Sequence, residues 1–267
     1  MALTKASLID VNGQELILDA DADTSITADT DDQIDIKVGG SDTVHMGLTT
    51  YNASDRIVLT NTSGNASMAI VAGTSGESSI FMADGTSGDA SYRGYLQYQH
   101  ANDNWNFGTA ATLAMKIDSA GHVTKPLQPA VLVTKSSSQL NIAVGSSVTQ
   151  VFDSEIFDVN GDFSSNTFTA PVTGKYLVNL QIRYQSIPTD VIYIQTYLAT
   201  SNGTRYMGLF GSGSSWFNSA ASYFRDGQSL VIDMDANDTF TVITVQSGGT
   251  QQIDIGQESY LSVALLS

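Results

Sequence analysis

Short apolar runs that recur at close intervals constrain the fold of this sequence more than any other feature. Apolar and polar residues alternate within the runs at 34–38, 56–59, 79–82, 95–99 and 113–117. Gly, Asn, Asp and Ser separate them, and a spacing of roughly ten to thirteen residues is typical of an all-β chain. Helical periodicity is almost absent, and the one short helix candidate is 4–9. The sequence therefore predicts an all-β fold.

A proline pair in the segment KPLQP, residues 125–129, marks the best linker candidate. Neither proline suits a central strand, and both favour extended chain. Longer apolar runs and most of the tyrosines follow this segment. We therefore expect an N-terminal region at 1–50, an elongated β-rich shaft at 51–125, a linker at 126–129 and a β-sandwich at 130–267.

A short repeat lies in the expected shaft, where 73–79 reads GTSGESS and 85–91 reads GTSGDAS. Each copy precedes aromatic residues, so the repeat predicts one turn and one strand per unit. A unit of this size cannot bury its own apolar face and needs neighbouring units or other chains. Chance similarity in a stretch rich in Gly, Ser and Thr is the alternative.

Charge and composition exclude several classes of partner. The chain has 27 acidic and 11 basic residues, a net charge of −16. Such a chain repels phosphate backbones and anionic lipids, so we expect no nucleic-acid partner. No run of eighteen apolar residues predicts membrane insertion, and the start of the chain contains no apolar segment suited to a signal peptide. The chain has no cysteine, which excludes disulfides and thiol chemistry.

Catalytic motifs are absent from the sequence. No Gly-x-Ser-x-Gly elbow or phosphate-binding loop occurs, and the three histidines are scattered without metal-ligand spacing. We therefore expect no enzymatic activity and no cofactor, with calcium as the one alternative. Carboxylates alternate at 19–23 and cluster at 29–32, and calcium prefers such oxygen ligands, but a solvated acidic turn is the favoured explanation for both runs.

The C-terminal part carries a set of motifs in a fixed order. The segment 166–176 reads NTFTAPVTGKY, apolar runs follow at 230–235 and 239–245, and 259–266 closes the chain with SYLSVALL. This order resembles the globular head of complement C1q and its tumour-necrosis-factor relatives. The resemblance implies a jelly-roll sandwich that forms a homotrimer. Asn237 stands where that family usually has Gly, and Tyr260 where it usually has Phe.

The resemblance and the apolar pattern together predict core or trimer positions in this domain. These are Phe152, Phe168, Tyr176, Tyr260, Leu261, Val263 and Leu265. Alternation in 191–198 places Ile192, Ile194, Thr196 and Leu198 on one face of a strand. By analogy with the family, three aspartates near an end loop are candidate calcium ligands: Asp233, Asp235 and Asp238.

Segments of the N-terminal half resemble tail-fibre and spike proteins of tailed phages. They are 26–36, 39–44 and 115–123, the last of which reads MKIDSAGHV and contains a tight turn at Gly121. The resemblance implies a virion protein, assembled in the host cytoplasm, whose region 1–50 contacts other virion proteins. The C-terminal knob would then bind a glycan or protein of the host surface.

Receptor contact is predicted in a Gly- and Ser-rich stretch, because loop aromatics can stack on sugar faces. The residues are Arg205, Tyr206, Phe210, Trp216, Phe217 and Tyr223. Packing into the sandwich core or the trimer seam is the alternative role for them.

Two other functions remain open at this point. A trimeric capsid decoration protein, of the cement or head-fibre type, would also be β-rich and non-enzymatic. A tailspike that degrades polysaccharide is the second alternative, although no carboxylate pair stands out for it.

Overall fold

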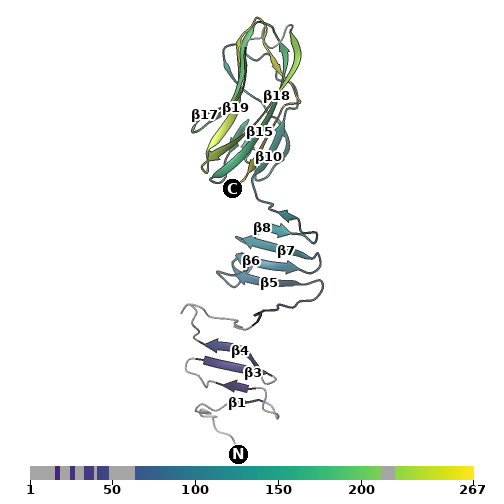
Figure 1. Cartoon of the computed structure of the whole chain (residues 1–267), viewed down its shortest axis with the longest axis vertical. Coiled ribbons are helices and arrows are strands. Elements are labelled where there is room, and N and C mark those ends of the chain that lie inside the picture. The colour runs from purple at the N-terminus through teal and green to yellow at the C-terminus, as the bar shows by residue number, and fades with distance from the viewer. Residues whose placement is uncertain (1–15, 19–24, 28–32, 39–40, 48–63, 212–219) are drawn as a thin grey trace, which may run out of the picture. The chain divides into compact units, whose positions relative to one another are not determined.

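The protein is described by a computed structural model that covers residues 16–18, 25–27, 33–38, 41–47, 64–211 and 220–267 (Figure 1). It divides into two compact units, Met1–Ala72 and Gly73–Ser267. Over the described residues the regular structure is β-strand apart from one 3-10 helix, η1 (Gly88–Tyr92). The predicted all-β fold is confirmed.

The first unit contains a four-stranded antiparallel sheet. Its strands are β1 (Leu16–Ile17), β2 (Ser25–Thr27), β3 (Gln33–Val38) and β4 (Ser41–Gly47), paired in that order. The strand predicted at 34–38 lies within β3 and is confirmed. The helix candidate at 4–9 and the strand predicted at 56–59 lie outside the described residues.

A second antiparallel sheet follows, and its five strands pair in chain order as a meander (Figure 1). Its strands are β5 (Glu77–Met82), β6 (Gly94–Gln99), β7 (Asn104–Thr109), β8 (Thr112–Ile117) and β9 (Val123–Thr124). The strands predicted at 79–82, 95–99 and 113–117 are confirmed. One strand follows the turn of each repeat copy, but the copies differ locally: 73–79 enters β5 directly, whereas 85–91 includes most of η1 before β6 begins.

The two faces of this sheet differ in polarity. Cross-strand partners share a face, and one face carries two apolar rows. The rows are Ile80, Leu96, Phe107 and Met115, and then Tyr98, Trp105, Ile117 and Val123. We call these eight residues the apolar shaft face. On the opposite face, side-chain hydrogen bonds join Asn104 to Asn106, Asn106 to Gln97, and Gln97 to Glu77.

The apolar shaft face is not covered by this chain in the described structure. Trp105 is 41% exposed although it contacts the Tyr98 ring at 5.1 Å, and Val123 and Ile80 are also exposed. A sheet buries its apolar face against a second layer. The sheet β5–β9 supplies only one layer.

The C-terminal domain is a sandwich of two antiparallel sheets. One sheet has the order β12-β10-β21-β15-β18, and the other β13-β14-β19-β16-β17. The first comprises β10 (Ala130–Thr134), β12 (Ser154–Asp158), β15 (Gly174–Ile187), β18 (Ala221–Met234) and β21 (Tyr260–Leu265), with β20 (Asp254–Ile255) paired to β15. The second comprises β13 (Phe163–Ser164), β14 (Thr167–Thr169), β16 (Val191–Thr200), β17 (Gly203–Gly211) and β19 (Thr239–Gly248), with β11 (Ser147–Thr149) paired to β19. This arrangement is the predicted jelly-roll sandwich.

Aromatic rings fill the space between the two sheets at one end. The Phe168 ring lies 5.5 Å from that of Tyr176 and 5.3 Å from that of Phe240. The Tyr176 hydroxyl donates to the Val172 carbonyl at 2.6 Å, so its buried ring closes the turn between β14 and β15. The polar tip of a buried tyrosine is thereby satisfied.

A β-bulge changes the face predicted for the start of β16. The register shifts between Val191 and Tyr193, so Val191 is buried and Ile192 is 59% exposed. The prediction that Ile192 shares a face with Ile194 is therefore wrong. An extra residue in one strand reverses the alternation on one side of it.

A buried hydrogen-bond chain joins the sheets at the middle of the sandwich. The Tyr184 hydroxyl lies 2.5 Å from Thr196 Oγ1, which lies 3.0 Å from Thr244 Oγ1. Burial raises the pKa of Tyr184, so the phenol stays neutral. The three hydroxyls satisfy one another where no solvent reaches.

We predict that Gly108→Ala destabilises the β5–β9 sheet. A Cβ at position 108 would lie 2.0 Å from Cε1 of Tyr95, whose ring covers the glycine. Displacing the ring should lower the free energy of unfolding by about 1–3 kcal/mol, measured by urea denaturation. Gly94→Ala in the neighbouring strand is the control, because its Cβ would meet Met82 at an ordinary 3.4 Å. Equal stability of the two variants would contradict the prediction.

Candidate functional site

The outward face of the sheet that contains β15 is apolar at its centre. Val131, Tyr176 and Val263 point into the core, so their strand neighbours point outward. Two cross-strand rows result. One row contains Phe157 and Leu132. The other contains Ala130, Ala264, Leu177 and Val231. We call these six residues the β15 face; Val231 on it is 51% exposed.

Polar groups on this sheet are small or lie toward the ends of the strands. The row of Phe157 and Leu132 continues across the sheet through Ser262, Asn179 and Ser229. Asn179 donates to Ser262 and accepts from Ser229, so these polar groups satisfy one another. At one end Lys175 Nζ lies 3.7 Å from Asp233. The centre of the face therefore combines apolar area with no unpaired charge, as the core of a protein–protein interface does.

An arginine organises the other end of the sheet. The Arg183 guanidinium pairs with Glu258 and lies over the Tyr223 ring, 4.0 Å from its centroid. The backbone N–H of Glu258 itself, followed by Arg183, holds the pKa of that carboxyl below its ordinary value. Close by, Tyr223 helps to line an open polar depression of about 370 Å³ whose other lining residues are Gln185, Ser186, Ile187, Ala220, Ser222 and Gln251.

A tyrosine-lined surface lies on the outward side of the second sheet. Tyr206 is 67% exposed, and its ring meets that of Tyr197 edge-on at 5.7 Å. The Tyr197 hydroxyl bonds Ser147 Oγ at 3.0 Å, which fixes its ring. Leu209, exposed on the same strand, pairs with Gln195. We call these five residues the Tyr206 surface, and none of them carries a charge.

The six predicted receptor residues do not form one surface. Phe210 is 5% exposed and packs between Tyr184 and Phe224 at 5.1 and 4.8 Å, so its predicted role as an exposed contact is wrong. It points inward because β17 continues through residues that the sequence suggests are a glycine-rich loop. Arg205 and Tyr206 are exposed on β17, and Tyr223 is exposed on β18 in the other sheet. Trp216 and Phe217 lie outside the described residues.

The predicted core and trimer residues separate into two groups. Phe152, Phe168, Tyr176, Leu261 and Val263 are buried between the sheets, and Leu265 packs against them. Tyr260 points outward instead and is exposed. It is outward because it precedes the inward Leu261 in an alternating strand.

The three aspartates proposed as calcium ligands hold other partners. The Asp238 carboxylate accepts from Ser201 Oγ at 2.8 Å, Asn202 Nδ2 at 2.5 Å and the Asp235 backbone at 2.8 Å. The Asp235 N–H, followed by Ser201, lowers the pKa of Asp238. Asp233 pairs with Lys175, and Asp235 accepts from Thr173. No group of three or more His, Asp or Glu side chains suited to a metal ion occurs among the described residues.

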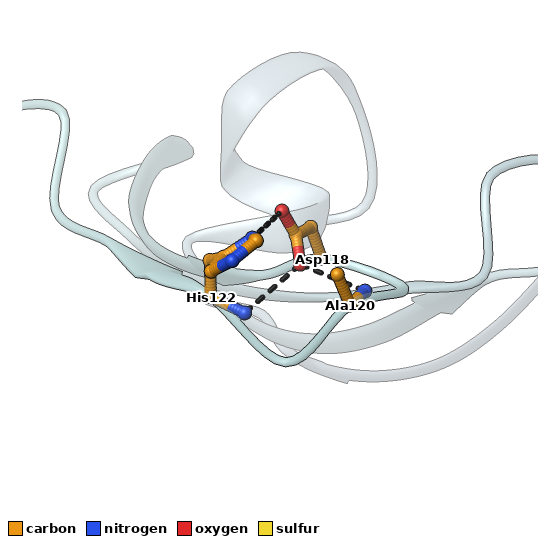
Figure 2. Close-up of polar contacts among 3 residues, drawn as sticks. All are labelled: Asp118, Ala120 and His122. Atoms are coloured by element: carbon orange, nitrogen blue, oxygen red, sulfur yellow. Dashed lines mark hydrogen bonds and ion pairs between the residues drawn. The ribbon is translucent and has the colours of Figure 1, made fainter.

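The turn predicted between β8 and β9 is organised by one aspartate (Figure 2). Asp118 Oδ1 accepts from the backbone N–H groups of Ala120 and His122, both at 2.9 Å. Asp118 Oδ2 lies 2.9 Å from His122 Nδ1. Gly121 adopts a φ of 85° in this turn, as the sequence predicts. His122 is thus a turn residue, whereas the other histidine with described side-chain contacts, His100, bonds Ser78 Oγ at 3.0 Å.

Comparisons with known proteins concern the fold. No protein-family model and no curated protein matches the sequence. Among solved structures, the globular domain of zebrafish complement 1qA is similar over 52% of this chain and 98% of its own, with 16% identity and a TM-score of 0.38. Murine APRIL is similar over 52% of this chain and 99% of its own, with 8% identity and a TM-score of 0.38. No helix in the described part of the chain is long and apolar enough to cross a membrane.

We predict that the Asp118 carboxyl titrates below its ordinary pKa. Its bond with the His122 side chain, followed by the His122 N–H, lowers the pKa of Asp118. A depressed pKa in the folded state means that this carboxylate stabilises the turn above about pH 4, and that the contribution is lost as pH falls through the folded pKa. Carbon-13 NMR titration of the carboxyl should show the low midpoint.

The variant His122→Ala tests the cause of that shift. It keeps the backbone N–H and removes the side-chain bond, so the Asp118 midpoint should rise part of the way to its ordinary value. An unchanged midpoint in this variant would assign the shift to the backbone donors alone.

Proposed function

We propose that this chain is a non-enzymatic, homotrimeric structural subunit of a tailed-phage fibre or spike whose C-terminal sandwich binds the host surface. One observation carries the proposal: the β5–β9 sheet and the sandwich each present an apolar face that this chain leaves uncovered in the described structure. Contiguous exposed apolar area of this kind marks an interaction site.

Copies of the same chain are the occupants that fit the β15 face best. Each apolar side chain removed from water contributes at about 25 cal/mol per Å² of buried area. The chain is strongly acidic, so copies repel one another at long range, but that repulsion is screened beyond about 8 Å at physiological ionic strength. The centre of the face carries no charge, so contact there does not bury any of the excess carboxylates.

The apolar shaft face also favours a trimer. Each chain supplies one five-stranded layer that carries its two full apolar rows on one side and the shorter row of Phe81, Tyr95 and Leu113 on the other. Three such layers that turn the apolar shaft face toward a common axis would bury all three of these faces at once and leave the amides of Gln97 and Asn106 outside. A closed cyclic assembly also limits the growth that open, sheet-edge association would allow.

The virion assignment rests on the sequence resemblance of 26–36, 39–44 and 115–123 to phage fibre segments. The absence of a recognisable catalytic motif in the sequence supports a structural role. Electron cryomicroscopy of the whole virion tests the assignment through position and copy number. Tens of copies or fewer on the tail would support the fibre assignment, whereas hundreds of copies on the capsid would show that the chain is a capsid decoration protein.

The Tyr206 surface is the part of the sandwich that we propose for host contact. Its two tyrosine rings, one amide and three hydroxyls are groups that stack on sugar rings and bond their hydroxyls. An uncharged patch on a chain of net charge −16 also avoids repelling an acidic envelope. Three copies per trimer would convert weak single contacts into avidity on a repeating glycan.

We predict that charge introduced on both apolar faces dissociates the trimer. The double variant Trp105→Glu with Val231→Glu places a carboxylate in each proposed interface and should yield a monomer at micromolar concentration in multi-angle light scattering. The control, Phe81→Glu with Ile192→Glu, adds the same charge at exposed apolar residues and should stay trimeric, because Phe81 lies on the opposite face of the β5–β9 sheet and Ile192 on the other sheet of the sandwich. A wild-type monomer at these concentrations would refute the assembly.

We further predict that Tyr206→Ala weakens binding of the trimer to host cells by about tenfold or more. Each lost ring contact is worth about 0.5–1.5 kcal/mol, and avidity compounds the three losses. Leu140→Ala, which truncates another exposed apolar residue of the domain, should bind as wild type. The measurement is competition by purified protein against phage adsorption, and undiminished competition by Tyr206→Ala would place the receptor contact elsewhere.

A further inference from the structure

The turn that connects the two sheets of the sandwich has the sequence DVNGDF, residues 158–163. Asp158 ends β12 in one sheet, and Phe163 begins β13 in the other. Asn160 and Gly161 have φ values of 84° and 74°, so the chain reverses sharply between them. The Asp158 carboxylate accepts from the Asp162 and Phe163 backbone N–H groups at 2.8 and 2.9 Å. The turn thus brings two aspartates together.

Asp162 is the unusual member of this turn. It is 8% exposed, and its Oδ2 is buried without a hydrogen-bond partner in the described structure. Buried carboxylates are ordinarily paired or bound to a metal, because an isolated charge is costly to desolvate. Burial raises the pKa of Asp162, and the neighbouring Asp158 charge raises it further, against a hydrogen bond from Asn160.

We propose that a calcium ion binds in this turn, with Asp162 Oδ2 and the Asp158 carboxylate as its charged ligands. Carboxylate oxygens are the hard ligands that calcium prefers. Each Asp158 oxygen keeps a second lone pair after accepting its backbone hydrogen bond. No ion pair occupies either aspartate among the described residues. A cation between them satisfies the orphan oxygen and removes the repulsion between the two carboxylates.

The rest of the turn fits a weak site. Asn160 Nδ2 donates to the Leu127 carbonyl at 3.1 Å, which holds this side chain in the turn. Two carboxylates fall short of the acidic groups of tight calcium sites, so water completes the shell. We expect a Kd of about 10⁻⁴–10⁻³ M, the range of extracellular modules. Magnesium should bind less well, because it requires near-ideal octahedral geometry.

Calcium at this position would act on the stability of the sandwich. The turn joins an edge strand of each sheet, β12 and β13. An ion that binds only the closed turn stabilises the folded state by mass action. The sandwich would then be more stable outside the cell, where calcium is millimolar, than in the calcium-poor cytoplasm.

Thermal unfolding of the full chain in 5 mM calcium chloride or in EGTA tests the site. We expect calcium to raise the Tm of the sandwich transition by about 3–6 °C. Asp162→Asn should abolish the response, whereas Asp233→Asn, which removes the same charge from an exposed position, should keep it. A response in Asp162→Asn equal to that of the wild type overturns the proposal.

Terbium luminescence gives a second measurement that does not need a variant. Burial raises the pKa of Tyr176, and the nearby charge of Asp162 adds to that shift, so excitation of the Tyr176 ring should sensitise a terbium ion bound at Asp162. We expect saturable luminescence that calcium displaces and magnesium displaces less well. Absence of saturable luminescence, together with no calcium effect on Tm, would show that Asp162 is buried as the neutral acid and overturn the site. If Asp162→Asn does not fold, this titration decides alone.

Discussion

An apolar sheet face must be covered, and this constraint organises the described structure at two places. In the sandwich the two sheets cover each other, so Phe168, Tyr176 and Leu261 are buried by the chain itself. The β5–β9 meander has one layer only, and its apolar face remains open. The sandwich also retains apolar residues on the outside of one sheet. The apolar faces that the chain covers by itself therefore form the core of the sandwich, and the apolar faces that it leaves uncovered are the proposed assembly surfaces.

Alternation in the sequence was sufficient to locate most strands but not to set every face. The runs at 34–38, 79–82, 95–99 and 113–117 all lie in strands, because period-two polarity is a direct consequence of the pleat. The bulge at Val191 reverses the pattern for Ile192, and a local register shift of this kind has no signature in residue type. The same limit applies to the repeat, since η1 forms from a segment almost identical to the one that enters β5.

The candidate sites could be predicted from the sequence less well than the fold. Glycines around Phe210 suggest a loop, yet β17 extends through them and turns the ring into the core. Tyr197 became part of the Tyr206 surface through cross-strand pairing, which spacing along the chain does not predict. The stretch DVNGD, residues 158–162, has no distinguishing pattern in the sequence, and only the fold buries Asp162 and leaves its Oδ2 unpartnered. Residue type suggested which side chains could bind a ligand, and the burial of each side chain in the fold decided which of them are placed to do so.

The distribution of charge connects these features. A net charge of −16 is tolerable in an assembled particle only if carboxylates lie at strand ends, in turns or in ion pairs, away from the contacting faces. Asp118 and Asp238 accept hydrogen bonds from turn donors, and Asp233 pairs with Lys175 at the end of the β15 face. Asp162 departs from this pattern, because it is a buried carboxylate for which the described chain supplies no positive partner. A diffusible cation meets that requirement without adding a basic side chain to the turn, and its binding would make the closure of the sandwich depend on the medium as well as on the sequence.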